Sequence, residues 1–491
     1  RGNTMKKEFW LVIGSQFLYG PEVLDTVQKR GKEMATELSC HLPYALVYKM
    51  TAKTGKELSD FVREANYRPE CLGVVTWCHT FSPSKMWLNA LDGLQKPWCH
   101  FATQYNRDIP NEEIDMDFMN LNQAAHGDRE HGFIGARLRK PRKVIAGYWK
   151  DETVQKRLAD WMRVCIGADA SRNLKVMRFG DNMREVAVTE GDKIEAQKRF
   201  GWQVNTWPVG TLVEYMDKVT DKEIDDLMAA YHAAYDFATD DVSAVRYQAR
   251  EELAMRRMMD EEGCGAFTNT FQNLYGMRQL PGLASQHLMA EGYGYGAEGD
   301  WKVGAMTAVM KKMGEKENGS SAFMEVYTYN LAPGKKYSLG AHMLEVCPSI
   351  AAGRPRIEVH PLGIGSREDP ARLVFEGKAG KAVFVSLIDM GGRFRMICQD
   401  IECVKPILDM PNLPVARVMW KTPGDFETAL ECWIIAGGSH HTVLGYDVTA
   451  EMMRDWARIM GIEFVHLTKD TRAEELEHDL MVDDFVWKFQ G

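Results

Sequence analysis

The chain has 491 residues, 45% of them hydrophobic and 26% charged, a composition typical of a globular protein with about two to four domains. Its 60 basic and 69 acidic residues give a formal charge of −9, which excludes the basic surface that a nucleic-acid partner requires. No apolar run reaches the roughly 18 residues of a membrane span and no signal peptide is evident, so we expect a cytoplasmic protein with no membrane partner.

The first third of the chain alternates short apolar runs with helical spacing. Strands are predicted over residues 9–13, 44–48, 72–78 and 98–102, and helices from Pro21 and over 54–65 and 85–94. This alternation predicts a Rossmann-like α/β domain with a parallel sheet over residues 1–172. Polar pairs follow three of the strands, where parallel sheets bind ligands: Ser15-Gln16, His79-Thr80 and Thr103-Gln104.

The rest of the chain divides into two further predicted domains. A strand and a long helix over 142–168 precede a second alternating region, which predicts a central Rossmann-like domain over 173–320. Within it, residues 246–257 predict a solvated helix face. From 321 to 491, strand-like segments separated by Gly and Pro predict a β-rich, barrel-like C-terminal domain. The expected fold class is therefore α/β, with two parallel-sheet domains followed by a β-rich one.

Ten cysteines are scattered along the chain without a CxxC pair. Most have apolar neighbours, which predicts buried free thiols, and such thiols persist in a reducing cytosol. A zinc site built from cysteines is excluded by the same spacing.

Four segments contain residues that could carry chemistry. They contain Glu298 and Asp300 after a glycine-rich stretch, Glu325 in an apolar run, His342 with Glu345, and His440-His441 after Gly437-Gly438. The apolar run at 432–435, before the histidine pair, is predicted as a strand. Two carboxylates with imidazoles suit Mn²⁺, Fe²⁺, Co²⁺ or Zn²⁺. Their spacing matches no short metal motif.

Each of these residues also has a purely structural explanation. Glu298 could cap a helix that begins near Trp301, since acidic groups are favourable there. Glu325 could lie on a solvated strand face, and His342 could be an ordinary buried histidine. The glycine turn before His440-His441 is more typical of a functional loop. Asp300 and Glu345 remain alternative ligands.

Longer segments of the chain resemble the L-arabinose isomerase family, from about Phe9 onward. The matching segments include Glu298-Gly-Asp-Trp301, Gly437-Gly-Ser-His-His-Thr442 and residues 9–20, 77–87, 114–123, 179–188, 279–283 and 342–350. The resemblance implies two α/β domains and a β-rich one. It also implies a homohexamer with active sites at subunit boundaries.

The resemblance further implies one Mn²⁺ per subunit, with other divalent metals as alternatives. Its ligands would be Glu298, Glu325, His342 and His441, and both carboxylates would be catalytic. The sugar pocket would be lined by Gln16, Leu18, Tyr19, His126, Met183, Phe271 and His440, with His126 reaching a neighbour's site. The implied reaction in arabinose catabolism converts L-arabinose to L-ribulose through an enediol, with D-galactose to D-tagatose as a second conversion.

One residue departs from the family pattern and leaves the sugar preference open. Phe17 stands where the family commonly has His, so an apolar ring replaces a hydrogen-bonding group beside the pocket. The competing interpretations are a metal-dependent hydrolase with the same ligands, a non-catalytic sugar-binding protein and a fucose-type isomerase.

Overall fold

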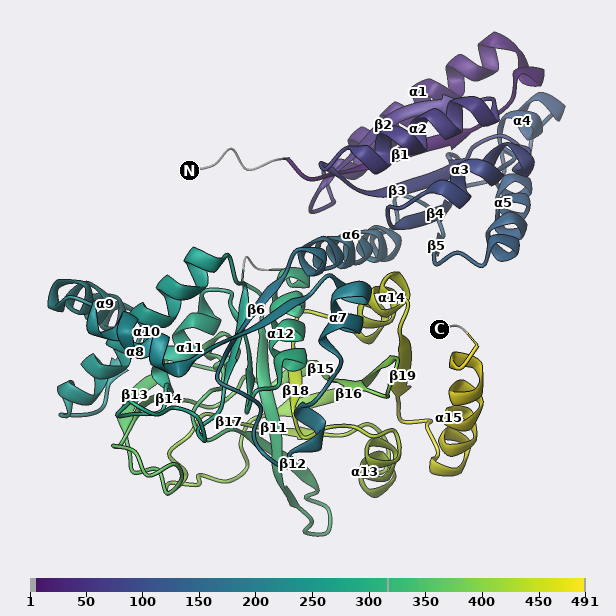
Figure 1. The fold of residues 1–491 in the computed structure, drawn as a ribbon. Coiled ribbons are helices and arrows are strands. Elements are labelled where there is room, and N and C mark those ends of the chain that lie inside the picture. The colour runs from purple at the N-terminus through teal and green to yellow at the C-terminus, as the bar shows by residue number, and fades with distance from the viewer. Residues whose placement is uncertain (1–5, 316–317, 490–491) are drawn as a thin grey trace. The chain divides into compact units, whose positions relative to one another are not determined.

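The computed structural model describes residues 6–315 and 318–489. The chain forms two compact units, the first ending at Asp169 and the second beginning at Ala170 (Figure 1). Division of the chain into three domains with borders at 172/173 and 320/321 stays a prediction. Among the described residues, none of the helices combines the length and apolar character that crossing a membrane requires.

Unit 1 contains a five-stranded parallel sheet in the order β2-β1-β3-β4-β5. Its strands are β1 (Glu8–Gly14), β2 (Ala45–Ala52), β3 (Cys71–Cys78), β4 (Trp98–Ala102) and β5 (Lys143–Ala146). Side chains of β1 alternate between two cores, Phe9, Leu11 and Ile13 on one face, and Trp10 and Val12 on the other. Burial on both faces explains the continuous apolar run in the sequence.

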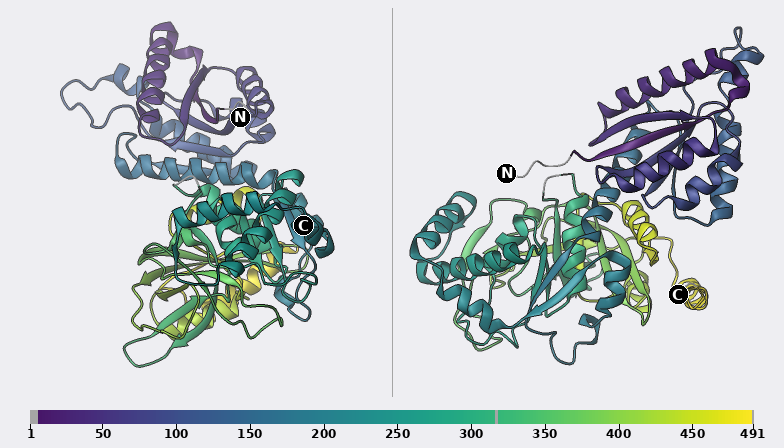
Figure 2. Two further views of the ribbon diagram at one scale, coloured as in Figure 1. Left: turned by 90° about the vertical axis from the view of Figure 1, so that its left-hand side faces the viewer. Right: turned by 45° about the horizontal axis from the view of Figure 1, so that its top comes forward.

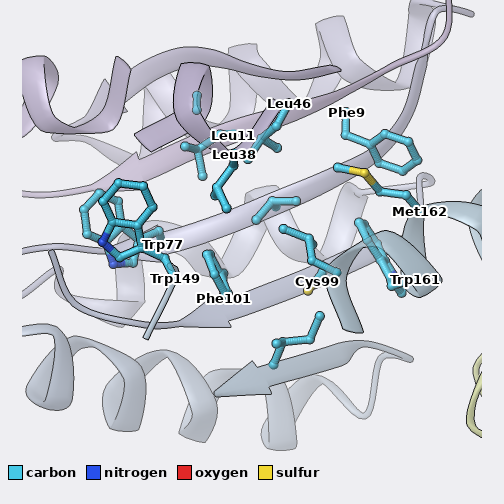
Figure 3. Close-up of a cluster of buried hydrophobic side chains, with 14 of the residues drawn as sticks. Phe9, Leu11, Leu38, Leu46, Trp77, Cys99, Phe101, Trp149, Trp161 and Met162 are labelled. Atoms are coloured by element: carbon cyan, nitrogen blue, oxygen red, sulfur yellow. The ribbon is translucent and has the colours of Figure 1, made fainter. Parts of the chain in front are cut away.

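Helices cover both faces of this sheet (Figures 1 and 2). On one face lie α1 (Gly20–Ser39) and α6 (Glu152–Arg172), and their core with the sheet is drawn in Figure 3. On the other lie α2 (Gly55–Tyr67), α3 (Leu88–Gly93) and α5 (Ala124–Leu138). Short helices η1 (Phe17–Tyr19), η2 (Ser84–Trp87) and α4 (Met116–Leu121) complete the unit. The parallel-sheet prediction for this region is confirmed.

Unit 2 begins with a four-stranded parallel sheet in the order β10-β9-β6-β7. The strands are β6 (Lys175–Phe179), β7 (Gln203–Trp207), β9 (Ala266–Asn269) and β10 (Gly294–Ala297). The helices of this part are η3 (Ala187–Thr189), α7 (Lys193–Phe200), α8 (Val209–Asp217), α9 (Asp221–Ala234), α10 (Val242–Glu262), α11 (Leu283–Ala290) and α12 (Trp301–Met313). A small sheet joins β8 (Asp236–Phe237), β13 (Arg356–Val359) and β14 (Ala371–Val374).

The rest of unit 2 is a closed antiparallel barrel, as the sequence predicts. Its strands are β11 (Ser321–Asn330), β12 (Tyr337–Ala341), β15 (Gly380–Asp389), β16 (Phe394–Val404), β17 (Arg417–Lys421) and β18 (Thr442–Gly445). The barrel closes because β15 pairs with both β16 and β18. Strand β19 (Glu463–Leu467) extends it in parallel beside β16. The remaining helices are η4 (Pro348–Ile350), α13 (Phe426–Ile435), α14 (Ala450–Met460) and α15 (Ala473–Trp487).

The prediction of a strand over residues 432–435 is wrong, because this run is the end of helix α13. Asp425 caps the helix by accepting a hydrogen bond from the Thr428 backbone N–H at 2.9 Å. A four-residue apolar run has no periodicity that separates a buried strand from a helix end, so the cap seven residues before the run decides.

Helix α12 packs against both the parallel sheet and the barrel. It contacts β9 and β10 on one side and β11, β15 and β18 on the other, and all its residues except Lys312 are buried. Glycines bring the backbones of β10 and α12 close together. A Cβ atom added to Gly294 would lie 2.1 Å from the Gly304 carbonyl oxygen, so only glycine fits there.

We expect Gly294→Ala to destabilise unit 2, since backbone atoms of α12 cannot move aside without shifting the helix. Overpacking of this kind costs about 1–3 kcal/mol of unfolding free energy. Gly210→Ala in α8 is the control, because its Cβ would meet open space and alanine favours a helix. Thermal unfolding should show a lower midpoint for Gly294→Ala only. Equal midpoints would contradict the close approach.

Helix α10 carries buried polar groups, so the solvated face predicted over 246–257 is only partly correct. Gln248, Glu251 and Glu252 are each fully buried. The Gln248 amide donates a hydrogen bond to Glu251 Oε2 at 2.9 Å, whereas Glu251 Oε1 has no hydrogen-bond partner. Burial raises the pKa of the Glu251 carboxyl well above its usual value.

This raised pKa predicts a pH-dependent stability. The folded chain holds the Glu251 proton more tightly than the unfolded chain, whose glutamate pKa is about 4.3. The free energy of unfolding therefore falls as pH rises above that value. Glu251→Gln, which resembles the protonated form, should raise the unfolding midpoint at pH 8 and change it little near pH 4. Exposed Glu262 on the same helix gives the control, Glu262→Gln. A Glu251→Gln variant less stable at pH 8 would contradict this assignment.

Candidate metal centre

Glu298 lies in a tight turn between β10 and α12. Its backbone has φ +58° and the next residue, Gly299, has φ +84°. A left-handed conformation is uncommon for glutamate and costs energy, so the surrounding structure must enforce it. Two contacts do so: the Met183 backbone N–H donates to the Glu298 carbonyl oxygen at 2.9 Å, and Gly299 packs closely on Asn182.

Asp300, and not Glu298, caps helix α12. Asp300 Oδ1 accepts hydrogen bonds from the backbone N–H groups of Lys302 and Val303, at 3.2 and 3.4 Å. The capping explanation considered for Glu298 is therefore wrong, and its carboxylate is left for another purpose.

The pairing of β11 with β12 places Glu325 beside His342. Glu325 is opposite Ala341 in the register, and His342 directly follows that residue. Glu325 Oε1 lies 3.3 Å from His342 Nε2. Both side chains are buried, so the solvated-face explanation for Glu325 is wrong.

His441 reaches the same point from the other side of β11. Thr442 pairs with Met324, which sets the preceding His441 beside Glu325. His441 Nε2 lies 3.2 Å from Glu325 Oε1 and 3.2 Å from Glu298 Oε2. Its ring is fully buried. The chain enters this strand through Gly437, whose φ of +83° allows the turn after α13.

A second carboxylate holds each of the two buried rings. Asp300 Oδ2 lies 3.1 Å from His441 Nδ1, and Glu345 Oε2 is hydrogen-bonded to His342 Nδ1. The Tyr295 hydroxyl donates to Glu345 Oε1 at 3.1 Å. With Nδ1 engaged in both rings, the Nε2 atoms face Glu325. Carboxylate–histidine pairs of this kind orient imidazoles toward metal ions in proteins.

The site concentrates negative charge. Burial alone would lower the pKa of His342, but Glu345 and Glu325 raise it to about 9. His441 behaves likewise: burial opposes its charge, yet Asp300, Glu298 and Glu325 raise its pKa well above the usual value. The pKa of Glu325 is lowered despite burial, because the nearby histidines favour its charged form. Such a field attracts a cation.

The residues also fit a cation geometrically. Glu298, Glu325, His440 and His441 can each offer a ligand atom, with all of these atoms within 4.8 Å of one another. Glu325 Oε1 is buried without a hydrogen-bond partner, although two imidazole nitrogens face it. His440 is exposed, and its ring centre lies 4.2 Å from that of His441.

A second group of possible ligands, Glu252, His287 and Glu291, does not fit a cation as well. The guanidinium of Arg256 is hydrogen-bonded to both Glu252 and Glu291. This positive charge already offsets one of the two negative charges and occupies an oxygen atom of each carboxylate.

Two further predicted sugar contacts lie close to the centre in unit 2. The Met183 backbone N–H donates a hydrogen bond to the Glu298 carbonyl oxygen. Phe271 lines a small cavity together with Glu298 and His342. Unit 2 thus brings together all the residues predicted for it, Met183, Phe271, Glu298, Glu325, His342, His440 and His441.

The other predicted contacts, Gln16, Leu18, Tyr19 and His126, belong to unit 1. Gln16 and Leu18 follow β1, and Leu18 is 82% exposed. The Tyr19 hydroxyl donates to Gln123 at 3.3 Å, one residue before α5, which carries the exposed His126. All of them adjoin the carboxyl end of the parallel sheet.

Phe17, the residue that departs from the family pattern, is 63% exposed. The Lys53 ammonium lies 5.7 Å from the centre of its ring. Both residues line an open cavity of about 420 Å³ with Leu24 and Tyr48.

The sequence did not reveal the roles of Asp300, Lys302 and Glu345. A signal was present, because Lys302 is a charged residue near the start of an otherwise apolar stretch, two residues after an acidic one. A helix apolar on all sides is buried, and a buried lysine needs acceptors for its protons, which an anion supplies best.

Comparison with known proteins identifies the family of the chain. Three family models match consecutive parts of the chain: the L-arabinose isomerase N-terminal domain at residues 3–173, the central domain at 175–316 and the C-terminal domain at 320–463.

Individual relatives match over nearly the whole chain. The L-arabinose isomerase of Geobacillus stearothermophilus is 51% identical over 489 residues, covering 98% of each chain. L-arabinose isomerase 1 of Bacillus licheniformis is 51% identical over 486 residues, again with 98% of each covered. That of Bacillus subtilis is 48% identical over 494 residues, with 99% of each covered. The chain therefore belongs to the L-arabinose isomerase family and is an isomerase.

Proposed function

We propose that this isomerase interconverts L-arabinose and L-ribulose with one divalent metal ion, Mn²⁺, per subunit. The observation that carries the proposal is the buried Glu325 Oε1, which lacks a hydrogen bond and faces two imidazole nitrogens beside Glu298. Membership of the family supports the reaction and the sugar.

Glu298, Glu325, His342 and His441 would hold the metal. We choose His342 over His440 as a ligand because a carboxylate holds its Nδ1 atom. Glu345 orients the His342 ring in this way, as Asp300 orients the ring of His441. His440 is exposed and has no such carboxylate, so it is available for a sugar hydroxyl. Oxygen and nitrogen ligands suit Mn²⁺, and other divalent first-row ions are alternatives.

When bound, the metal supplies a positive charge that polarises the adjacent oxygens of the open-chain sugar. Glu298 and Glu325 carry the proton transfers. One carboxylate takes the proton from the carbon beside the aldehyde, and the carbonyl oxygen gains a proton from the acid form of the other. The resulting enediol receives the first proton on the former aldehyde carbon and returns the second from its neighbouring hydroxyl. Atoms balance, and the aldose becomes a ketose.

Residues of unit 1 would complete a sugar pocket at a subunit boundary of a homohexamer, with His126 reaching into a neighbour's site. Gln16, Leu18, Tyr19 and His126 lie together at one sheet edge, where parallel sheets bind ligands. Leu18 and His126 are exposed in the single chain and so available to a neighbour. A cytoplasmic location is supported by the cysteines, all of which are free thiols.

Conversion of D-galactose to D-tagatose is a further proposed activity. The two sugars differ in length at the end remote from the reacting carbons. Phe17 is exposed beside Leu18 and offers an apolar ring where the family commonly has His. This position is therefore expected to shape the preference between them.

Glu298→Gln and Glu325→Gln should each lower turnover about 10²–10⁴-fold, because an amide cannot take up the sugar's proton. Turnover would be measured at saturating Mn²⁺, with metal content checked for each variant. Asp400→Asn is the matched control, since Asp400 also pairs with a histidine, His466, but is exposed. Near wild-type turnover of both glutamate variants with metal bound would disprove their role.

Removal of metal should abolish the reaction. Chelator-treated protein incubated with L-arabinose is expected to form L-ribulose only after Mn²⁺ is added back. Parallel assays with D-galactose and L-fucose would establish the sugar preference. Ketose formation that does not depend on metal, or none at all, would refute the proposal.

A further inference from the structure

We propose that Lys302 is a positioning residue, which fixes Asp300 so that His441 presents Nε2 to the metal. This inference rests on the proposed metal site. Lys302 touches neither a predicted ligand nor the sugar pocket, and two residues, Asp300 and His441, stand between it and the proposed metal.

Lys302 is held rigidly inside unit 2. Its side chain is fully buried, and its ammonium has three partners for its three protons. It donates to the carbonyl oxygens of Thr189 and Glu190, at 3.0 and 2.7 Å, and lies 3.1 Å from Asp300 Oδ1. A buried ammonium in such contacts cannot turn away, since any other position would leave its charge without a partner.

Asp300 divides its two oxygen atoms between separate tasks. Oδ1 receives the Lys302 ammonium and the first N–H groups of α12, whereas Oδ2 faces His441 Nδ1 at 3.1 Å. If the ammonium were absent, Oδ1 would keep only two long backbone hydrogen bonds, at 3.2 and 3.4 Å. The carboxylate could then rotate, and the His441 ring would lose its fixed orientation.

Lys302 also connects the centre to the loop that carries Met183. The Asn182 side chain donates to the Thr189 carbonyl oxygen at 2.7 Å, the same atom that accepts from Lys302. The Met183 backbone in turn donates to the carbonyl oxygen of Glu298. The Asn182 side chain still holds this loop when the ammonium is removed, so the effect of Lys302 on the site passes through Asp300 and His441.

The same helix provides a matched control, Lys311. It too is buried, at 1% exposure, but its ammonium contacts Cys347 Sγ at 3.3 Å and the Asn318 carbonyl oxygen at 3.4 Å. None of these groups is a predicted ligand or bonds to one through a side chain. Lys302→Met thus removes a buried positive charge near the site. Lys311→Met removes an equal charge from the same helix but away from the site.

The test is Mn²⁺ affinity, measured by the electron paramagnetic resonance signal of free Mn²⁺ during titration of the chelator-treated full-length protein. Lys302→Met should bind Mn²⁺ about 10–100-fold more weakly than wild type, the usual effect of losing an outer-shell partner. Saturating Mn²⁺ should restore its turnover. Lys311→Met should keep wild-type affinity, even if both variants melt earlier.

A double-mutant cycle shows whether Lys302 acts through Asp300. Asp300→Asn and the double variant with Lys302→Met should have equal affinities, since the lysine then has no carboxylate to hold. The double variant also removes both members of the buried ion pair, which avoids an uncompensated charge if Lys302→Met alone does not fold.

The outcomes separate this inference from the proposed function. Wild-type protein that binds no Mn²⁺ would overturn the proposed function and the inference with it. Wild-type binding with equal affinities for Lys302→Met and Lys311→Met would overturn the inference alone. A further loss in the double variant, relative to Asp300→Asn, would overturn the route through Asp300.

Discussion

The close packing of α12 against β10 is the constraint on which the rest of unit 2 depends. Gly294, Gly296 and Gly304 allow backbone to approach backbone, and the helix in turn contacts the barrel strands. Because α12 lies between the parallel sheet and the barrel, its first residue is fixed relative to both. Asp300 and Glu298 lie one and three residues before it, so their positions are set by packing before any ligand is present.

Strand register supplies the remaining residues of the centre. Glu325 lies on β11, whose two neighbours β12 and β18 bring His342 and His441 to it from opposite sides. A slip of one residue in either pairing would turn the alternate side chain toward the site. The ladder of backbone hydrogen bonds therefore determines which atoms meet, and the second carboxylates, Asp300 and Glu345, determine which ring nitrogens face inward.

Much of this arrangement could be predicted from the sequence. The buried strand at Phe9, the β-rich region after residue 321 and the cluster of glutamates and histidines were all predicted, the last with the help of the family resemblance. The wrong predictions concern the ends of single helices. The run at 432–435 is too short to identify as a helix end, and the sequence offers Glu298 as a possible cap of α12, whereas Asp300, considered only as an alternative ligand, is the cap. The buried pair of Lys302 with Asp300 depends on tertiary packing, which no spacing rule encodes.

The position of β18 between β11 and β15 has a consequence for how the chain folds. The Thr442 hydroxyl donates a hydrogen bond to the carbonyl oxygen of Met324, 118 residues earlier. Strand β11 is therefore synthesised long before its partner strand β18. Until then one edge of an apolar strand is open to pairing with other chains, a known route to aggregation. Only the arrival of β18 closes that edge, and the same event brings His441 to Glu325. Completion of the barrel and assembly of the candidate site are thus a single late step.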